Sequence, residues 1–216
     1  MKFSALLASG LILMSASARA DLVGFWDFNG NLDRTAGLQG DLFMDLVGYG
    51  SIGLEGYGVG TEVNLPDGFS AGQSYRFYNL AQIVETTRVE VLNLDLTGYT
   101  APVISIAARN DSVFTAGDSF KLEYNIGGGW VEATTFADPD NAFQTFSFAF
   151  PAGTLDGVAN VGIRFAHFTG LTALNEFAVD NLQVTATPVP EPSALALVAS
   201  AVVAIGFGMS RRRRLG

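Results

Sequence analysis

Few side chains in this 216-residue sequence have the chemistry that catalysis requires. The chain contains no cysteine, which excludes thiol catalysis, thiolate zinc sites and disulfide bonds, and its single histidine is His167. Catalytic zinc ordinarily has three protein ligands, and no elbow motif supports a serine nucleophile. On strict strand alternation His167 shares a face with Val161, Ile163 and Phe165, so a core or half-buried position is favoured over a metal or catalytic role.

One pair of carboxylates has the residue types that glycoside hydrolysis uses. Glu123 and Glu132 fall on opposite strands of an expected hairpin, and glycosidases place two carboxyl groups beside the scissile bond. Glu123, however, lies on the polar face of an ordinary alternating strand. Solvated strand charge is therefore the better interpretation, and we expect no enzymatic activity.

Aromatic rings offer a different chemistry, because their large apolar faces pack on the apolar faces of sugars. Most of the aromatic side chains are expected in a core. Trp130 directly follows a run of three glycines and is the best surface candidate for stacking on a glycan.

The elements that position these residues are β-strands. From Ser119 to Ile126, apolar and polar residues alternate; the triplet 127–129 then tolerates the backbone of a tight turn, and Trp130 to Phe136 returns as the partner strand. No stretch between residues 21 and 187 has sustained helical periodicity. The sequence predicts an all-β fold, a single jelly-roll-like two-sheet β-sandwich over residues 21–187. Further strands are expected at 22–28, 51–60, 74–79, 88–96, 103–109, 143–150, 161–168 and 177–185; residues 21–72 are otherwise expected to form long loops around one or two strands.

Two of these strands change their apolar face partway along. In the strand 88–96 the apolar positions shift from Val89 and Val91 to Leu92, Leu94 and Leu96. In the last strand they shift from 177 and 179 to 182 and 184, with Asp180 and Asn181 at the change. A β-bulge in each strand explains the shift, because one extra residue reverses the side-chain parity.

The expected domain is strongly acidic. Between residues 21 and 187 there are six basic and 20 acidic side chains, a formal net charge of −14. Such a surface repels the phosphates of nucleic acids and other anionic polymers, so nucleic acid is not an expected partner.

The N-terminus has the pattern of a secretory signal peptide over residues 1–20. Lys2 provides positive charge, residues 3–14 form an apolar run, and Ala18 and Ala20 provide a small-x-small cleavage site, so the mature chain is expected to begin at Asp21. An uncleaved anchor is the alternative, but the apolar run is too short to span a membrane comfortably.

The C-terminus, residues 188–216, combines three features. Val189, Pro190, Glu191, Pro192 and Ser193 form a Pro-Glu-Pro motif, residues 193–210 are uncharged and mostly apolar, and Arg211, Arg212, Arg213 and Arg214 follow. At about 1.5 Å per residue, 193–210 would form a helix roughly 27 Å long, close to the membrane core of about 30 Å. The arginines would be retained on the cytoplasmic side.

This arrangement closely resembles the PEP-CTERM sorting signal of envelope-bearing bacteria, although Leu215 and Gly216 follow the arginines. The resemblance implies that the chain is a substrate of exosortase, a membrane-embedded cysteine peptidase that is thought to cut near the motif. It implies an exported protein, anchored in the inner membrane by its C-terminal helix and then located at the cell surface or outside the cell.

The domain resembles extracellular jelly-roll modules related to carbohydrate-binding and concanavalin-like domains. The resemblance rests mainly on residues 24–29, 95–99, 120–130, 161–165 and 179–184. Related jelly rolls often hold calcium between the first and last strands, which implies Asp180 as an oxygen ligand with Asn181 and Asp27 as companions. A bulge shaped by hydrogen bonds to local backbone is the interpretation we place first. No other cofactor is expected.

Together these features predict an exported, non-enzymatic protein of the cell surface or extracellular matrix. A glycan-binding module for exopolysaccharide is the alternative, and a glycoside-active enzyme ranks behind both.

The motif predicts that Glu191 takes part in processing, because an acid between two prolines lies on extended, exposed backbone suited to a peptidase cleft. Glu191→Ala should leave full-length protein in the membrane fraction of a host with exosortase, as fractionation and immunoblotting would reveal. Equal release of the variant and the wild type would contradict the assignment.

Overall fold

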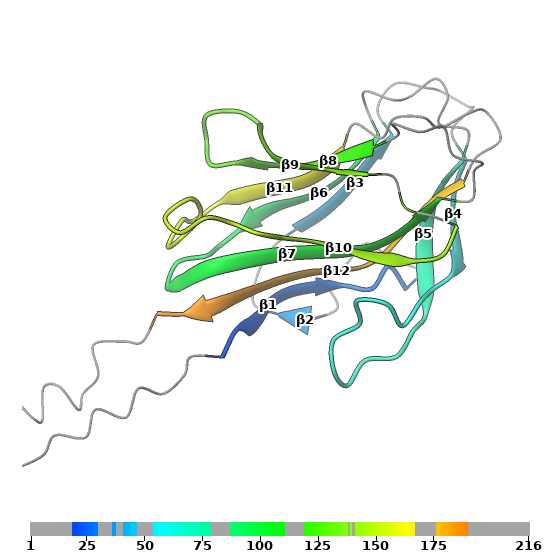
Figure 1. The fold of residues 1–216 in the computed structure, drawn as a ribbon, viewed down its shortest axis with the longest axis horizontal. Coiled ribbons are helices and arrows are strands. Elements are labelled where there is room, and N and C mark those ends of the chain that lie inside the picture. The colour runs from blue at the N-terminus through cyan, green and yellow to red at the C-terminus, as the bar shows by residue number, and fades with distance from the viewer. Residues whose placement is uncertain are drawn as a thin grey trace, which may run out of the picture.

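The computed structural model describes residues 19–29, 36–37, 41–46, 54–78, 87–110, 119–137, 139, 141–166 and 176–189. These residues contain 12 strands and no helix, and the strands form two antiparallel sheets that pack face to face (Figure 1). The prediction of an all-β, two-sheet sandwich is confirmed. The expected signal peptide, except residues 19 and 20, and the chain from 190 onward lie outside the described residues.

The seven-stranded sheet is organised around its long last strand. Along its main path the order is β10 (Gln144–Ala149), β7 (Tyr99–Asn110), β12 (Glu176–Pro188), β1 (Asp21–Trp26) and β2 (Ala36–Gly37). Strand β12 pairs with β7 on one side. On its other side it pairs first with β5 (Gln73–Tyr78) and then with β1, while β4 (Leu54–Val59) extends the sheet beyond β5.

The five-stranded sheet contains the expected hairpin at one edge. Its order is β3 (Asp41–Leu46), β6 (Thr87–Leu94), β11 (Val161–Ala166), β8 (Ser119–Asn125) and β9 (Val131–Ala137). Gly127 and Gly129 have φ of 104° and 106°, which only glycine adopts easily, and the Asn125 side chain accepts their two N–H groups. The glycine triplet therefore makes the turn predicted for it.

Both predicted bulges are present. In β6, Leu92 and Asn93 together oppose Gly162 of β11, and Asn93 has a φ of 55°. In β12, Asn181 and Leu182 together oppose Ile106 of β7, and Asn181 has a φ of 49°. Asparagine tolerates this left-handed backbone better than most residues, so the residue type at each bulge matches its conformation.

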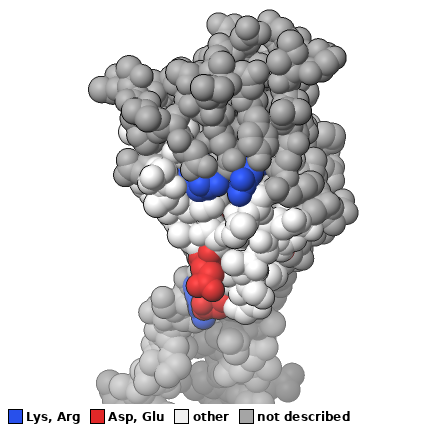
Figure 2. Space-filling view, turned by 90° about the vertical axis from the view of Figure 1, so that its right-hand side faces the viewer, with Lys and Arg blue, Asp and Glu red and all other residues white. Residues whose placement is uncertain are grey.

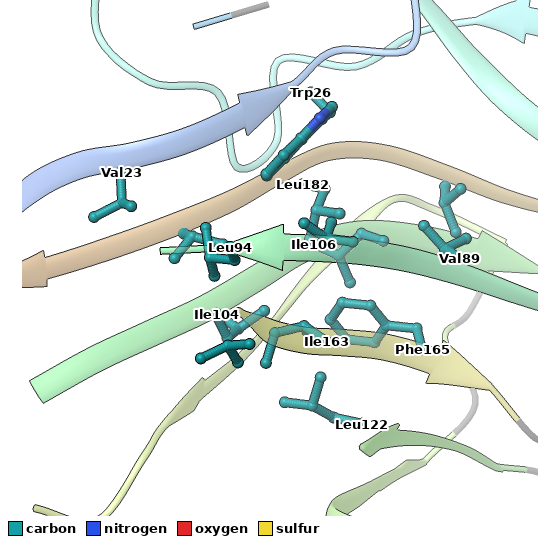
Figure 3. Packing of buried hydrophobic residues seen from close by; sticks show 14 of the residues in the cluster. Val23, Trp26, Val89, Leu94, Ile104, Ile106, Leu122, Ile163, Phe165 and Leu182 are labelled. Atoms are coloured by element: carbon teal, nitrogen blue, oxygen red, sulfur yellow. The ribbon is translucent and has the colours of Figure 1, made fainter. Parts of the chain in front are cut away.

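The core lies between the sheets and is formed by the alternating apolar positions of both (Figure 3). Phe120 of β8 is its aromatic centre, because its ring lies within about 6 Å of the rings of Phe136, Phe146, Phe165 and Phe177. These rings belong to both sheets, so Phe120 connects the two layers.

Truncation of Phe120 is therefore predicted to be costly. Phe120→Ala should lower the free energy of unfolding by about 3–5 kcal/mol, the usual cost of deleting a buried phenylalanine ring. Chemical denaturation would measure this change. Phe148→Ala, at a half-buried position of β10, is the matched control and should cost less. Equal losses would contradict the central role of Phe120.

Candidate functional site

Trp130 lies on the outer face of the five-stranded sheet. It stands between the glycine turn and β9, and its side chain is half-buried. A Cβ atom placed on Gly162 would lie 3.0 Å from Cη2 of the indole and 3.4 Å from Leu92. Because Val161 and Ile163 point into the core, Gly162 points outward. The absence of a side chain at Gly162 thus gives the indole room to rest against the sheet.

Arg164 fixes this indole from the neighbouring position on β11. Its guanidinium carbon lies 4.2 Å from the centroid of the Trp130 ring, within the range of a cation–π interaction. Its Nε donates to Oε2 of Glu123, the residue opposite it on β8, at 2.5 Å. The guanidinium is thus held by a carboxylate and an aromatic ring together, which restricts the motion of all three side chains.

The two carboxylates considered for glycoside chemistry are each paired with a cation. Glu123 is only 8% exposed, so the expectation of a solvated charge was wrong. Glu123 is paired with Arg164, and the guanidinium of Arg164 packs against the ring of Trp130. Glu132 is exposed and accepts bonds from Lys121 Nζ at 2.6 Å and the Thr135 hydroxyl at 2.8 Å. The bond to Glu132 raises the pKa of Lys121. Both carboxylates are therefore engaged in ion pairs within the protein.

The second group of functional candidates surrounds the bulge in β12. Asp180 is 1% exposed; its Oδ2 accepts the N–H of Thr61 and its Oδ1 accepts the N–H of Asn181, both at 2.8 Å. Asn181 Nδ2 donates to the carbonyl oxygens of Thr61 at 2.7 Å and Val63 at 2.9 Å. These bonds attach the loop between β4 and β5 to the bulge.

Burial raises the pKa of Asp180 to about 7, which is far above its ordinary value. Loss of solvation is the main cause, and the negative charge of Asp27 adds to it. The two N–H bonds from Thr61 and Asn181 act in the opposite direction because they favour the ionised form. The carboxyl group therefore titrates near neutral pH.

The expected calcium ligands are partly brought together. Asp27 is close enough to Asp180 to raise its pKa, and Asn181 adjoins them, although its Nδ2 is already bonded to carbonyl groups. Calcium takes about 6–8 oxygen ligands. Within the described residues, no group of three or more His, Cys, Asp or Glu side chains is arranged to hold a metal ion. The hydrogen bonds fit the bulge interpretation, and calcium binding stays a prediction.

Several predicted site residues lie outside the described part of the chain. They are Ala18, His167, Pro190, Glu191, Pro192, Ser193 and Arg211 to Arg214. Ala20 and Val189 are described and exposed, and the Val189 N–H donates to the Gly98 carbonyl at 2.7 Å. In the described ranges, no helix is long and apolar enough to cross a membrane; the expected span 193–210 is not among them.

Sequence reasoning did not identify Arg164 as part of the Trp130 site. A signal was available, because alternation along 161–165 points Gly162 and Arg164 outward on the strand. What the sequence does not contain is the pairing of β11 with β8, which places both residues beside Glu123 and the hairpin turn.

No protein-family model matches the chain, and a search of characterised proteins gave no significant match. Among solved structures, the chain is similar to the CBM22-1–GH10 modules of a Clostridium thermocellum xylanase complexed with xylohexaose. The TM-score is 0.49 and the sequence identity is 12%; the match covers 80% of this chain and 30% of the xylanase chain. It is also similar to domain 4 of a Geobacillus stearothermophilus arabinanase in complex with arabinotriose (TM-score 0.48, 11% identity, 78% and 94% covered).

A third similar structure is a CBM22 xylan-binding domain of Paenibacillus barcinonensis, with a TM-score of 0.44 and 18% identity over 76% of this chain and 98% of that one. This chain spans less than a third of the xylanase structure. At TM-scores below 0.5 these likenesses support no inference about a ligand, which has to come from this chain's own side chains.

The raised pKa of Asp180 predicts a pH-dependent stability. Between about pH 4 and pH 7 the folded state keeps a proton that the unfolded state has lost, so the free energy of unfolding should fall as the pH rises. The fall should reach a few kcal/mol, since each pKa unit corresponds to about 1.4 kcal/mol. Denaturant titrations across this range would measure it.

Asp180→Asn should remove this pH dependence, whereas Asp67→Asn at an exposed position should keep it. Calcium, if bound, would favour the ionised form and raise the melting temperature, by about 2.7 kcal/mol of added stability at a hundredfold excess over Kd. Identical melting with calcium and with chelator would rule out the calcium site.

Proposed function

We propose that this chain is a non-catalytic glycan-binding module that acts outside the cell. The observation that carries the proposal is the position of Trp130, a half-exposed indole held on the outer face of the five-stranded sheet by Arg164 and Gly162. A ring that is already ordered loses little conformational entropy when a sugar stacks on it, so a larger part of the contact energy appears as affinity.

Polar groups around the ring have the chemistry to bind sugar hydroxyls. Lys121 and Glu132 form an exposed ion pair on the same hairpin, and Asn125 is half-exposed beside Gly162. Such groups donate and accept hydrogen bonds, as the hydroxyls of a sugar do. An apolar platform bordered by a few polar groups is the general composition of small-molecule sites.

The charge pairing supports binding over hydrolysis. A glycosidase of the usual kind needs one protonated carboxyl group and one ionised carboxylate at the scissile bond. Glu123 forms an ion pair with Arg164, and Glu132 forms one with Lys121, so each carboxylate is already engaged with a cation of the protein.

Export and sorting complete the proposal. Residues 1–20 and 188–216 have the features of a signal peptide and of a sorting signal read by exosortase, and the proposal takes both from the sequence. Our first interpretation was a surface or matrix protein, with glycan binding as the alternative. The geometry at Trp130 favours the alternative, and the two are compatible because a module that binds exopolysaccharide would retain the protein in that matrix.

Trp130→Ala is predicted to weaken glycan binding by about tenfold or more, the usual effect of removing a central aromatic contact. A glycan array would identify the ligand, and calorimetry would then compare the two proteins. Trp130→Phe should retain part of the affinity, and Val131→Ala, an exposed apolar neighbour, should retain all of it. An array without hits, or unchanged affinity in a folded Trp130→Ala protein, would refute the proposal.

A further inference from the structure

Two arginines line one pocket on the seven-stranded sheet. The pocket has a volume of about 350 Å³, near the lower limit of about 300–1,000 Å³ for small-molecule sites. Arg76 and Arg109 line it, together with Val59, Gly60, Asn141, Ala142 and Phe143. Two of the six basic side chains between residues 21 and 187 thus face the same space.

The strand register explains why these arginines meet. Arg76 of β5 and Arg109 of β7 both pair with Ala178 of β12, one from each side. Neighbouring strands are about 4.8 Å apart, so the two Cα atoms are separated by roughly 10 Å with a methyl group between them. Phe177 and Val179 point into the core, so Ala178 and the arginines are on the outer face of the sheet.

The surroundings of both arginines favour defined positions. The guanidinium of Arg76 lies across the backbone at Gly58, where a Cβ atom would overlap it. The guanidinium carbon of Arg109 lies 5.3 Å from the centroid of the Phe143 ring. Both arginines also have other contacts with the protein, and five N–H donors on each guanidinium make a protein contact compatible with a ligand contact.

This basic pocket contrasts with the acidity of the domain. Figure 2 looks at the side of the molecule that includes β4 and β5; one group of basic atoms gathers there above the acidic atoms, and further basic atoms lie beside the acidic ones. At physiological ionic strength the field of distant charges is largely screened beyond about 8 Å. The net charge of −14 therefore opposes a long polyanion that lies along the acidic surface more than it opposes one anionic group inside the pocket.

From this geometry we propose that the pocket binds the carboxylate of an acidic sugar residue. Guanidinium groups match the planar, two-oxygen geometry of a carboxylate and bind it through paired hydrogen bonds. The Phe143 ring and the Asn141 amide provide apolar and polar contacts for the remainder of a sugar. The site is on the sheet opposite to Trp130, so it is independent of the function proposed above.

The first experiment changes only the ligand. Calorimetry with the purified protein should give a Kd for trigalacturonate at least about tenfold lower than that for its fully methyl-esterified form, because the ester removes the charged hydrogen bonds. The preference should weaken as salt is added. Equal affinity for acid and ester would overturn the proposal, and so would equally tight binding of triglutamate, which carries carboxylates without a sugar.

The second experiment changes the protein. Arg76→Gln and Arg109→Gln should each remove most of the preference for the acid, and Arg109→Lys should retain only part of it because lysine lacks the planar fork. Arg88→Gln, which removes one positive charge from β6 in the opposite sheet, is the matched control and should bind as the wild type does. Trp130→Ala should also keep the preference, which separates a failure of this proposal from a failure of the previous one. A preference that persists in folded Arg109→Gln protein would overturn the assignment.

Discussion

The bulge at Asp180 and Asn181 is the constraint on which the seven-stranded sheet depends. Strand β12 is paired on both sides, and at the bulge one of its neighbours changes from β5 to β1. Where a strand changes partners, some backbone N–H and C=O groups have no neighbouring strand to pair with. Leaving such groups buried without a hydrogen bond costs free energy. Here the Asp180 carboxylate and the Asn181 amide take the place of a neighbouring strand, because they bond to the backbone of residues 61–63.

A carboxylic acid with a pKa near 7 in that position is a compromise between two requirements. The N–H groups of Thr61 and Asn181 need an acceptor, which favours the ionised form, whereas burial favours the neutral form. Gly60 adds a steric requirement, since a Cβ there would lie 2.9 Å from Asp180 Oδ2. The loop and the bulge are thus fitted to each other, and neither can change independently.

The parts of the fold that depend on local sequence were predictable. Alternation identified the hairpin, and the change of parity in 88–96 and 177–185 identified both bulges, because side-chain direction reverses with a single extra residue. Strands β2 and β3 were not predicted individually. Their surroundings are rich in glycine, and β3 is defined by its pairing with β6, more than 40 positions later in the chain.

The candidate sites were less predictable, for the same reason. Trp130 was recognised because it follows a turn, but its partner Arg164 comes from another strand. Thr61, which donates to Asp180, lies 119 residues earlier, and the two pocket arginines are neighbours only through Ala178. Composition was misleading as well, because the net acidity of the domain gives no sign of a local group of cations. The sequence shows which side chains are present. It does not show which of them are neighbours, because that depends on the register of β11 with β8 and of β12 with β5 and β7.

The pairing of the first and last strands gives the domain a polarity along its long axis. Asp21 lies opposite Ala186, so β1 begins beside the end of β12 (Figure 1). Ala178, between the two arginines, is ten residues before Pro188 on the same strand, which corresponds to roughly 33 Å of extended chain. A tether attached at the C-terminal end would therefore hold the domain at one end, with the arginine pocket far from the point of attachment.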